Sequence, residues 1–72
     1  MYEVWFVNSQ GQHRLIGTAN DRDFAGKIIS DFLNKHNYRH YYTRGFMVDE
    51  KTEKLDVGSY TEFFYVIKKD DQ

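Results

Sequence analysis

A run of aromatic and β-branched residues near the C-terminus, from Val57 to Ile67, restricts the fold more than any other stretch of the sequence. Residues of these types fit the pleated, half-buried surface of a β-sheet. Successive side chains of a strand point to opposite faces, and neither face of this run is plainly polar. Because a strand that is apolar on both faces is usually central in its sheet, we expect one long central strand from Leu55 to about Lys68.

The alternation divides the side chains of this strand between the two faces of the sheet. The set expected beneath a helix is Phe63, Tyr65 and Ile67. The set expected on a face that no helix covers is Tyr60, Phe64 and Val66. Gly58 and Ser59 interrupt the apolar pattern, and we expect them to form a bulge where the strand bends.

The N-terminal part of the chain predicts a β-hairpin, with strands from Tyr2 to Val7 and from His13 to Ala19. Gly11 supplies a turn position at which a positive φ costs little. With a two-residue turn formed by this glycine and the residue before it, Phe6 lies opposite Leu15.

A helix is expected after this hairpin and runs to about His36. Asn20 is the expected N-cap, and Asp23 three residues later completes a weak capping box. An apolar stripe at helical spacing predicts packing against one face of the sheet. The stripe consists of Phe24, Ala25, Ile28, Ile29, Phe32 and Leu33.

The remaining segment predicts a third strand from Tyr38 to Val48 and a polar turn from Asp49 to Lys54. The fold class is then α+β, with the order ββαββ and a four-stranded sheet that one helix covers on one face. The most apolar strands, the first and fourth, are expected in the centre, which gives the sheet order 2-1-4-3. If the helical connection makes these two strands parallel, the fold is β-grasp-like. A wholly antiparallel sheet and a strand exchanged between two chains are the alternatives.

Length and charge exclude several classes of protein. We expect the 72 residues to form a single domain, 1–72, and they include no cysteine for a disulfide or a thiolate metal site. A net charge of −1 argues against a protein held to nucleic acid mainly by phosphate contacts. No stretch approaches the ~18 apolar residues of a membrane span, and we find no secretory signal. We therefore expect a cytoplasmic protein that does not bind membranes.

One helix covers only one face of a four-stranded sheet, so large side chains are expected on the other, uncovered face. An apolar patch of roughly a few hundred Å² on a small domain usually marks an interaction surface. We therefore expect a non-enzymatic module that binds a protein partner, or a second copy of itself as a homodimer, through this face. The expected contact residues are Trp5, Ile16, Tyr41, Tyr60 and Phe64.

The segment from Lys35 to Phe46 interleaves basic and aromatic residues and contains no acidic residue. Single-stranded nucleic acids bind such surfaces because bases stack on aromatic rings while arginine contacts phosphate. Arg44-Gly45-Phe46 begins like the third-strand motif of RNA-recognition domains, but Met47 and Val48 depart from it. Single-stranded nucleic-acid binding is therefore the alternative function. Its expected residues are Arg39, Tyr41, Tyr42 and Arg44.

The sequence contains no recognisable catalytic, metal or cofactor motif. His36 and His40 straddle the expected helix end, and no carboxylate lies between Asp31 and Asp49, so a zinc site is not expected. Ser59 lacks the second glycine of a nucleophile elbow. We therefore expect neither an enzyme nor a bound cofactor.

The residues from Leu55 to Phe64, after the run Tyr41-Tyr42-Thr43-Arg44, resemble small uncharacterised proteins of Gram-positive bacteria and their phages. The resemblance is greatest in the second half of the chain. Those proteins have no assigned activity, so the resemblance implies no site residues. It implies a bacterial or prophage accessory protein rather than a fragment of an enzyme.

Overall fold

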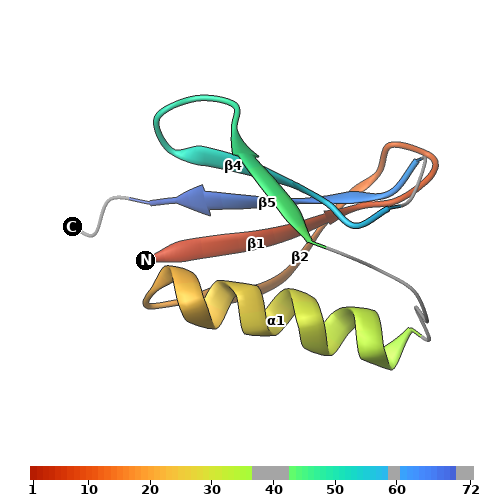
Figure 1. Cartoon of the computed structure of the whole chain (residues 1–72), viewed down its shortest axis with the longest axis horizontal. Helices are drawn as coiled ribbons and strands as arrows, with labels where there is room; N and C mark the ends of the chain where they lie inside the picture. Colours follow the sequence, from red (N-terminus) through yellow and green to blue (C-terminus); the bar gives the residue numbers. More distant parts are fainter. Residues whose placement is uncertain (37–42, 59–60, 70–72) are drawn as a thin grey trace.

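The computed structural model describes residues 1–36, 43–58 and 61–69, which form five strands and one helix. The helix lies on one side of the sheet (Figure 1). In chain order, the elements are β1 (Tyr2–Val7), β2 (His13–Ala19), α1 (Arg22–Lys35), β3 (Arg44–Met47), β4 (Thr52–Asp56) and β5 (Phe63–Lys68).

The sheet has the order β2-β1-β5-β4-β3, and every neighbouring pair of strands is antiparallel. The predicted α+β class with one helix on the sheet is therefore confirmed. The predicted β-grasp arrangement is wrong, because β1 and the strand beside it, β5, run in opposite directions. After the helix, the chain returns to the edge of the sheet at β3 rather than to the strand beside β1.

The long strand predicted from Leu55 to Lys68 is interrupted, because it contains the end of β4 and the whole of β5, which pair with each other. β4 begins at Thr52, so the predicted polar turn from Asp49 to Lys54 is too long. The chain turns at Gly58, where φ is +86°, a conformation that favours glycine. The Asp56 carboxylate accepts a hydrogen bond of 2.9 Å from the Gly58 N–H and stabilises this turn. The predicted count of four strands and the order 2-1-4-3 are therefore wrong, since the predicted fourth strand fills two adjacent places. Gly58 marks a reversal of the chain and not a bulge.

This reversal also decides which side chains of β5 face the helix. Pairing with β1 sets Phe64 beside Phe6 and Val66 beside Val4, and the exposed fractions of Phe64 and Val66 are 0% and 2%. Because side chains alternate with a period of two, misplacing the start of a strand by one residue exchanges its two faces. The side chains of β5 that point away from α1 are Phe63, Tyr65 and Ile67, the reverse of the predicted division.

The bounds of β1 and β2 confirm the predicted hairpin, but its turn is longer than the expected two-residue loop. Asn8 Oδ1 accepts hydrogen bonds of 2.9 Å from the N–H groups of both Gln10 and Gln12. Gly11 has a positive φ of +77°, as the sequence predicts. The Asn8 side chain thus organises the whole loop between the two strands.

The register of this hairpin shifts by one residue part-way along the strands. Val4 lies opposite Gly17, but Trp5 lies opposite Leu15. The predicted pair of Phe6 with Leu15 is therefore wrong. Since Trp5 points away from α1, the shift moves Leu15 to the same side of the sheet as Trp5.

α1 begins one residue later than predicted, because Asp21 and not Asn20 is the N-cap. Asp21 Oδ1 accepts a hydrogen bond of 2.8 Å from the Phe24 N–H. The predicted apolar stripe packs on the sheet except at Phe24, whose side chain is 50% exposed. Its fully buried members are Ala25, Ile29 and Leu33.

The helix passes very close to β2 at Gly17. A Cβ atom at this position would lie 3.1 Å from Ile28 Cδ1, which is tighter than ordinary van der Waals contact. The absence of a side chain at Gly17 therefore lets α1 lie against β1 and β2 (Figure 1).

An ion pair connects the first turn of α1 to β4. Arg22 Nε lies 2.7 Å from Glu53 Oε1, and Arg22 Nη2 lies 3.1 Å from Glu53 Oε2. The hydrogen bonds to Glu53 raise the pKa of Arg22 above its ordinary value. This two-point contact links the helix to the half of the sheet formed by β3 and β4.

Candidate functional site

The candidate site is the face of the sheet that points away from α1, hereafter the outer face. Cross-strand pairing aligns one side chain from each of the five strands in a single row on this face. Paired residues of neighbouring strands point to the same side of a sheet, so the row is continuous. This central row consists of Leu15, Trp5, Tyr65, Lys54 and Phe46.

Ring contacts hold the aromatic side chains of the outer face in place. The Phe63 and Tyr65 rings meet edge to face with their centroids 5.3 Å apart. Lys54 Nζ lies 4.1 Å from the centroid of the Phe63 ring, in a cation–π contact. The His13 ring lies 6.1 Å from the Tyr65 ring. A partner would therefore meet rings that are already positioned.

Trp5 is oriented by a short polar network on β1. Its indole Nε1 donates a hydrogen bond of 3.1 Å to Glu3 Oε1. The same Glu3 oxygen lies 3.7 Å from Lys69 Nζ. This arrangement satisfies the polar atom of the indole and leaves its apolar ring, which is half-buried, as the contact surface.

A hollow of about 310 Å³ opens on the outer face. Its lining combines the apolar surfaces of Trp5, Tyr65 and Ile67 with the carboxylate of Glu3 and the ammonium group of Lys69. The complete lining is Glu3, Trp5, His13, Thr52, Tyr65, Ile67 and Lys69. A mixed lining of this kind suits a partner segment in which an apolar side chain is flanked by polar residues.

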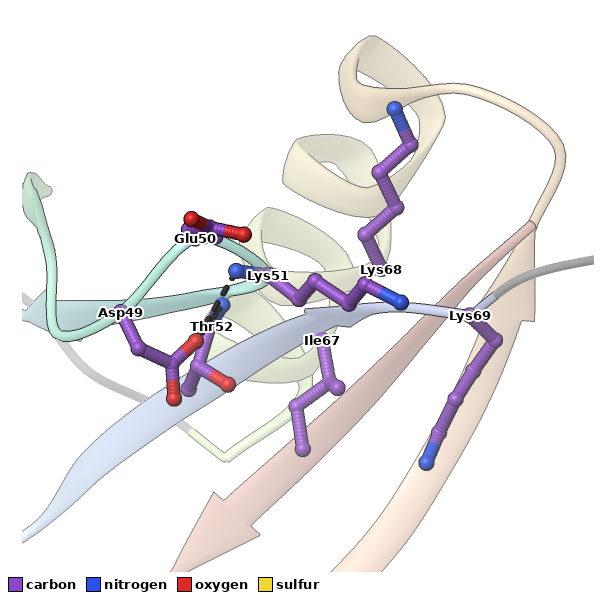
Figure 2. Close-up of a pocket in the computed structure, with 7 residues that line it drawn as sticks. All are labelled: Asp49, Glu50, Lys51, Thr52, Ile67, Lys68 and Lys69. Carbon is purple, nitrogen blue, oxygen red and sulfur yellow. Dashed lines mark hydrogen bonds between the residues drawn. The ribbon is translucent and has the colours of Figure 1, made fainter.

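A larger hollow, of about 580 Å³, lies between the β3–β4 turn and the end of β5 (Figure 2). Asp49 Oδ1 accepts hydrogen bonds of 2.9 Å from the N–H groups of Lys51 and Thr52. These hydrogen bonds hold the pKa of Asp49 below its ordinary value, and the bond from the Lys51 N–H has the largest effect. Figure 2 shows the side chains of Lys68 and Lys69 pointing to opposite sides of β5, so they do not converge on one ligand.

The residues predicted to bind a partner lie in three different environments. Trp5 lies in the central row of the outer face. Ile16 falls at the register shift of β2 and packs against the core. Phe64 is fully buried on the α1 side of the sheet, so its predicted place on the uncovered face is wrong. Tyr41 and Tyr60 lie outside the described residues.

Of the four residues predicted to bind single-stranded nucleic acid, Arg44 is the one that the structure describes. Its side chain is exposed on β3, and its cross-strand partner is Asp56. The carboxylate of Asp56 offsets the positive charge at this position. Arg39, Tyr41 and Tyr42 lie outside the described residues.

Sequence reasoning missed most of the central row, because it placed the turns wrongly. Tyr65 was predicted beneath the helix, and Leu15 was predicted opposite Phe6, whose side chain packs on the α1 side. A signal for the missed turns exists in the sequence: Asn8 and Asp56 each precede a glycine by two or three residues. Short carboxylate and amide side chains of this kind bind the backbone of the following turn.

Within the described residues, no group of three or more His, Asp or Glu side chains is arranged to hold a metal ion. No helix in the same part of the chain is long and apolar enough to cross a membrane. Comparison with models of protein families, with curated proteins and with solved structures found no significant match to this chain.

Proposed function

We propose that the protein is a non-enzymatic binding module whose outer face binds another polypeptide. The observation that carries the proposal is the central row, which presents large side chains across all five strands. The ends of the row are the most exposed, at 46% for Leu15 and 53% for Phe46. Four of the five side chains in the row are aromatic or aliphatic, and exposed apolar side chains gathered on one face of a small domain are typical of interaction sites.

The charges around the row favour a polypeptide partner. The acidic residues on or beside the outer face are Glu3 and Asp56, and the basic residues there are Arg44, Lys54 and Lys69. A polyanion such as single-stranded nucleic acid would meet two carboxylates on this surface, which opposes its binding. A protein surface with apolar side chains in the centre and charges of both signs at the edge fits this face.

Trp5 and Tyr65 are the expected anchors of the contact. They are cross-strand neighbours, and both lie in the lining of the 310 Å³ hollow. Large aromatic residues in the middle of an interface contribute most of its binding energy. Their positions on paired strands also reduce the entropy that is lost when a partner binds.

The test uses peptides as the probe. Linear peptides are selected from a random displayed library against the wild-type protein, synthesised, and titrated while the emission of Trp5 is recorded. Trp5 is the sole tryptophan of the chain, so its emission reports directly on the outer face. We expect the selected peptides to be rich in aromatic and aliphatic residues and to shift the Trp5 emission.

Two matched variants test whether the binding site lies on the outer face. Leu15→Glu introduces a charge at the end of the central row, while Phe24→Glu introduces the same charge at an equally exposed position on α1. We expect Leu15→Glu to weaken peptide binding by at least about tenfold and Phe24→Glu to leave it unchanged. The proposal would be overturned if Leu15→Glu left the peptide affinity unchanged and peptide binding did not alter the Trp5 emission. Salt-sensitive binding of an oligothymidylate, with no peptide binding, would instead support the nucleic-acid alternative.

A further inference from the structure

Aromatic rings form much of the wall of the 310 Å³ hollow on the outer face. Trp5 and Tyr65 are cross-strand neighbours and both are half-buried, so part of each side chain is open to a partner. A third ring belongs to His13 and lies 6.1 Å from the Tyr65 ring. The face of an aromatic ring carries partial negative charge, so it attracts cations and repels anions. The walls of the hollow therefore favour a cationic group.

The outer face already contains one contact between a cation and a ring. Lys54 Nζ lies 4.1 Å from the centroid of the Phe63 ring. Lys54 is the cross-strand neighbour of Tyr65 on β4, but it does not line the hollow. Because this ammonium group contacts Phe63, the rings of Trp5 and Tyr65 are left for a cation that comes from a partner.

Glu3 adds a negative charge to the same hollow. Both of its contacts use Oε1, which accepts the 3.1 Å hydrogen bond from Trp5 Nε1 and lies 3.7 Å from Lys69 Nζ. Oε2 accepts no hydrogen bond from the described residues. No buried side-chain oxygen in this part of the chain lacks a hydrogen bond, so Oε2 must be accessible to solvent. The carboxylate therefore has one oxygen available to an N–H donor of a partner.

Lys69 also lines the hollow, but it holds Glu3 only weakly. The 3.7 Å between Lys69 Nζ and Glu3 Oε1 is longer than a hydrogen bond, and the Lys69 side chain is 49% exposed. Ion pairs as exposed as this one contribute little free energy. A cation from a partner can therefore displace the lysine ammonium group into solvent at little cost.

We propose that the partner segment inserts an arginine side chain into the hollow, where the guanidinium group stacks on the Trp5 ring and donates a hydrogen bond to Glu3 Oε2. This inference rests on the proposed function, because it names the chemistry of the polypeptide that the outer face binds. The hydrogen bond from Trp5 Nε1 places the carboxylate at the edge of the indole, within reach of a planar group stacked on the ring.

This geometry selects arginine over lysine. A guanidinium group is planar and weakly hydrated, so it stacks on an aromatic face while its N–H groups point outward in its own plane. A lysine ammonium group is compact and strongly hydrated, and it cannot cover the ring in this way. The partner is accordingly an apolar segment that carries an arginine, and its charge is opposite to that of Glu3.

The test uses blocked tripeptides that have arginine, leucine or glutamate between two leucines. Each is titrated to about 10 mM while the emission of Trp5, the sole tryptophan of the chain, is recorded. We expect the arginine tripeptide to bind at least about fivefold more tightly than the other two. The tripeptides need no prior selection, so the test does not depend on which sequences a library yields.

Two variants of the hollow have opposite expected effects. Glu3→Gln keeps an oxygen that can accept the Trp5 indole N–H but removes the charge, and it weakens binding of the arginine tripeptide at least about fivefold. Lys69→Gln removes the competing ammonium group and strengthens binding about twofold. Glu50→Gln is the matched control at an exposed position of the β3–β4 turn and leaves the affinity unchanged. General damage to the hollow would weaken binding in both variants.

The proposal would be overturned if the arginine tripeptide bound no better than the leucine tripeptide, or if Lys69→Gln weakened its binding. Failure of this inference alone would leave the library-selected peptides bound to the outer face and still sensitive to Leu15→Glu. Failure of the proposed function would abolish that sensitivity as well, so the two failures are distinguishable.

Discussion

Arg22 holds both carboxylate oxygens of Glu53, a residue 31 positions away in the sequence, at distances of 2.7 and 3.1 Å. This contact joins the start of α1 to β4. α1 lies mainly against β1 and β2, so the pair links the helix to the opposite half of the sheet. The position of the β3 edge relative to the core therefore depends in part on one ion pair.

A double-mutant cycle measures the strength of this pair. The side chains of Arg22 and Glu53 are 38% and 21% exposed, so water screens the attraction between them. We expect Arg22→Met and Glu53→Gln to show a coupling free energy of about 0.5–1 kcal/mol in urea unfolding. Additive losses in the double variant would show that the pair contributes nothing to stability.

Gly45 leaves the space that the Glu53 carboxylate occupies. A Cβ atom at Gly45 would collide with Glu53 Oε2 and lie 3.1 Å from Glu53 Cδ. We therefore expect Gly45→Ala to displace the carboxylate and to lower the free energy of unfolding by about 1 kcal/mol. The loss should be smaller in an Arg22→Met background, where the pair is already absent. An equal loss in both backgrounds contradicts this explanation.

The stability of the β3–β4 turn depends on pH through Asp49. Its ordinary pKa of 3.8 is lowered in the fold, because the carboxylate accepts hydrogen bonds from the N–H groups of Lys51 and Thr52. A carboxylate with a lowered pKa stabilises the fold above its unfolded pKa, and this contribution is lost as the pH falls through the folded pKa.

The window for this effect therefore lies below the ordinary value of 3.8. We expect the advantage of wild type over Asp49→Ala, measured by urea unfolding, to shrink as the pH falls from about 5 to about 2. NMR titration of the Asp49 carboxyl group provides the direct measurement. A value at or above 3.8 would falsify the assignment.

The elements with a strong local pattern were predictable from sequence. The alternation of Tyr2–Val7 and His13–Ala19 and the apolar stripe of α1 gave the correct bounds to within a residue. The cap was misplaced because Asn20 and Asp21 are equally good N-cap residues. The chain reversal at Gly58 was missed, because both sides of it are rich in residues that favour strands.

The candidate site was less predictable, because it depends on register. One extra residue in β2 moves Leu15 to the outer face, and the turn at Gly58 moves Tyr65 there. Neither change alters the composition of a strand, but each exchanges its faces. Trp5 was placed correctly, since β1 is an uninterrupted strand whose register does not depend on the turns.

Substitutions at two adjacent residues of β5 test which of its side chains face the core and which face outward. Phe64 is 0% exposed in the core, whereas Tyr65 is half-buried on the outer face. We expect Phe64→Ala to lower the free energy of unfolding by about 3–5 kcal/mol and Tyr65→Ala by less than about 2 kcal/mol. The opposite ranking is what the sequence alone predicted, and it would contradict the structure.

The most direct test of binding through the outer face is an NMR titration of the ¹⁵N-labelled protein with a selected peptide. We predict that the largest amide shifts fall on the neighbourhood of Trp5, Leu15 and Tyr65, which are aligned in the central row. Leu15→Glu should abolish these shifts at the same peptide concentration. Shifts that centre on α1, with Trp5 and Tyr65 unchanged, would contradict binding at this face.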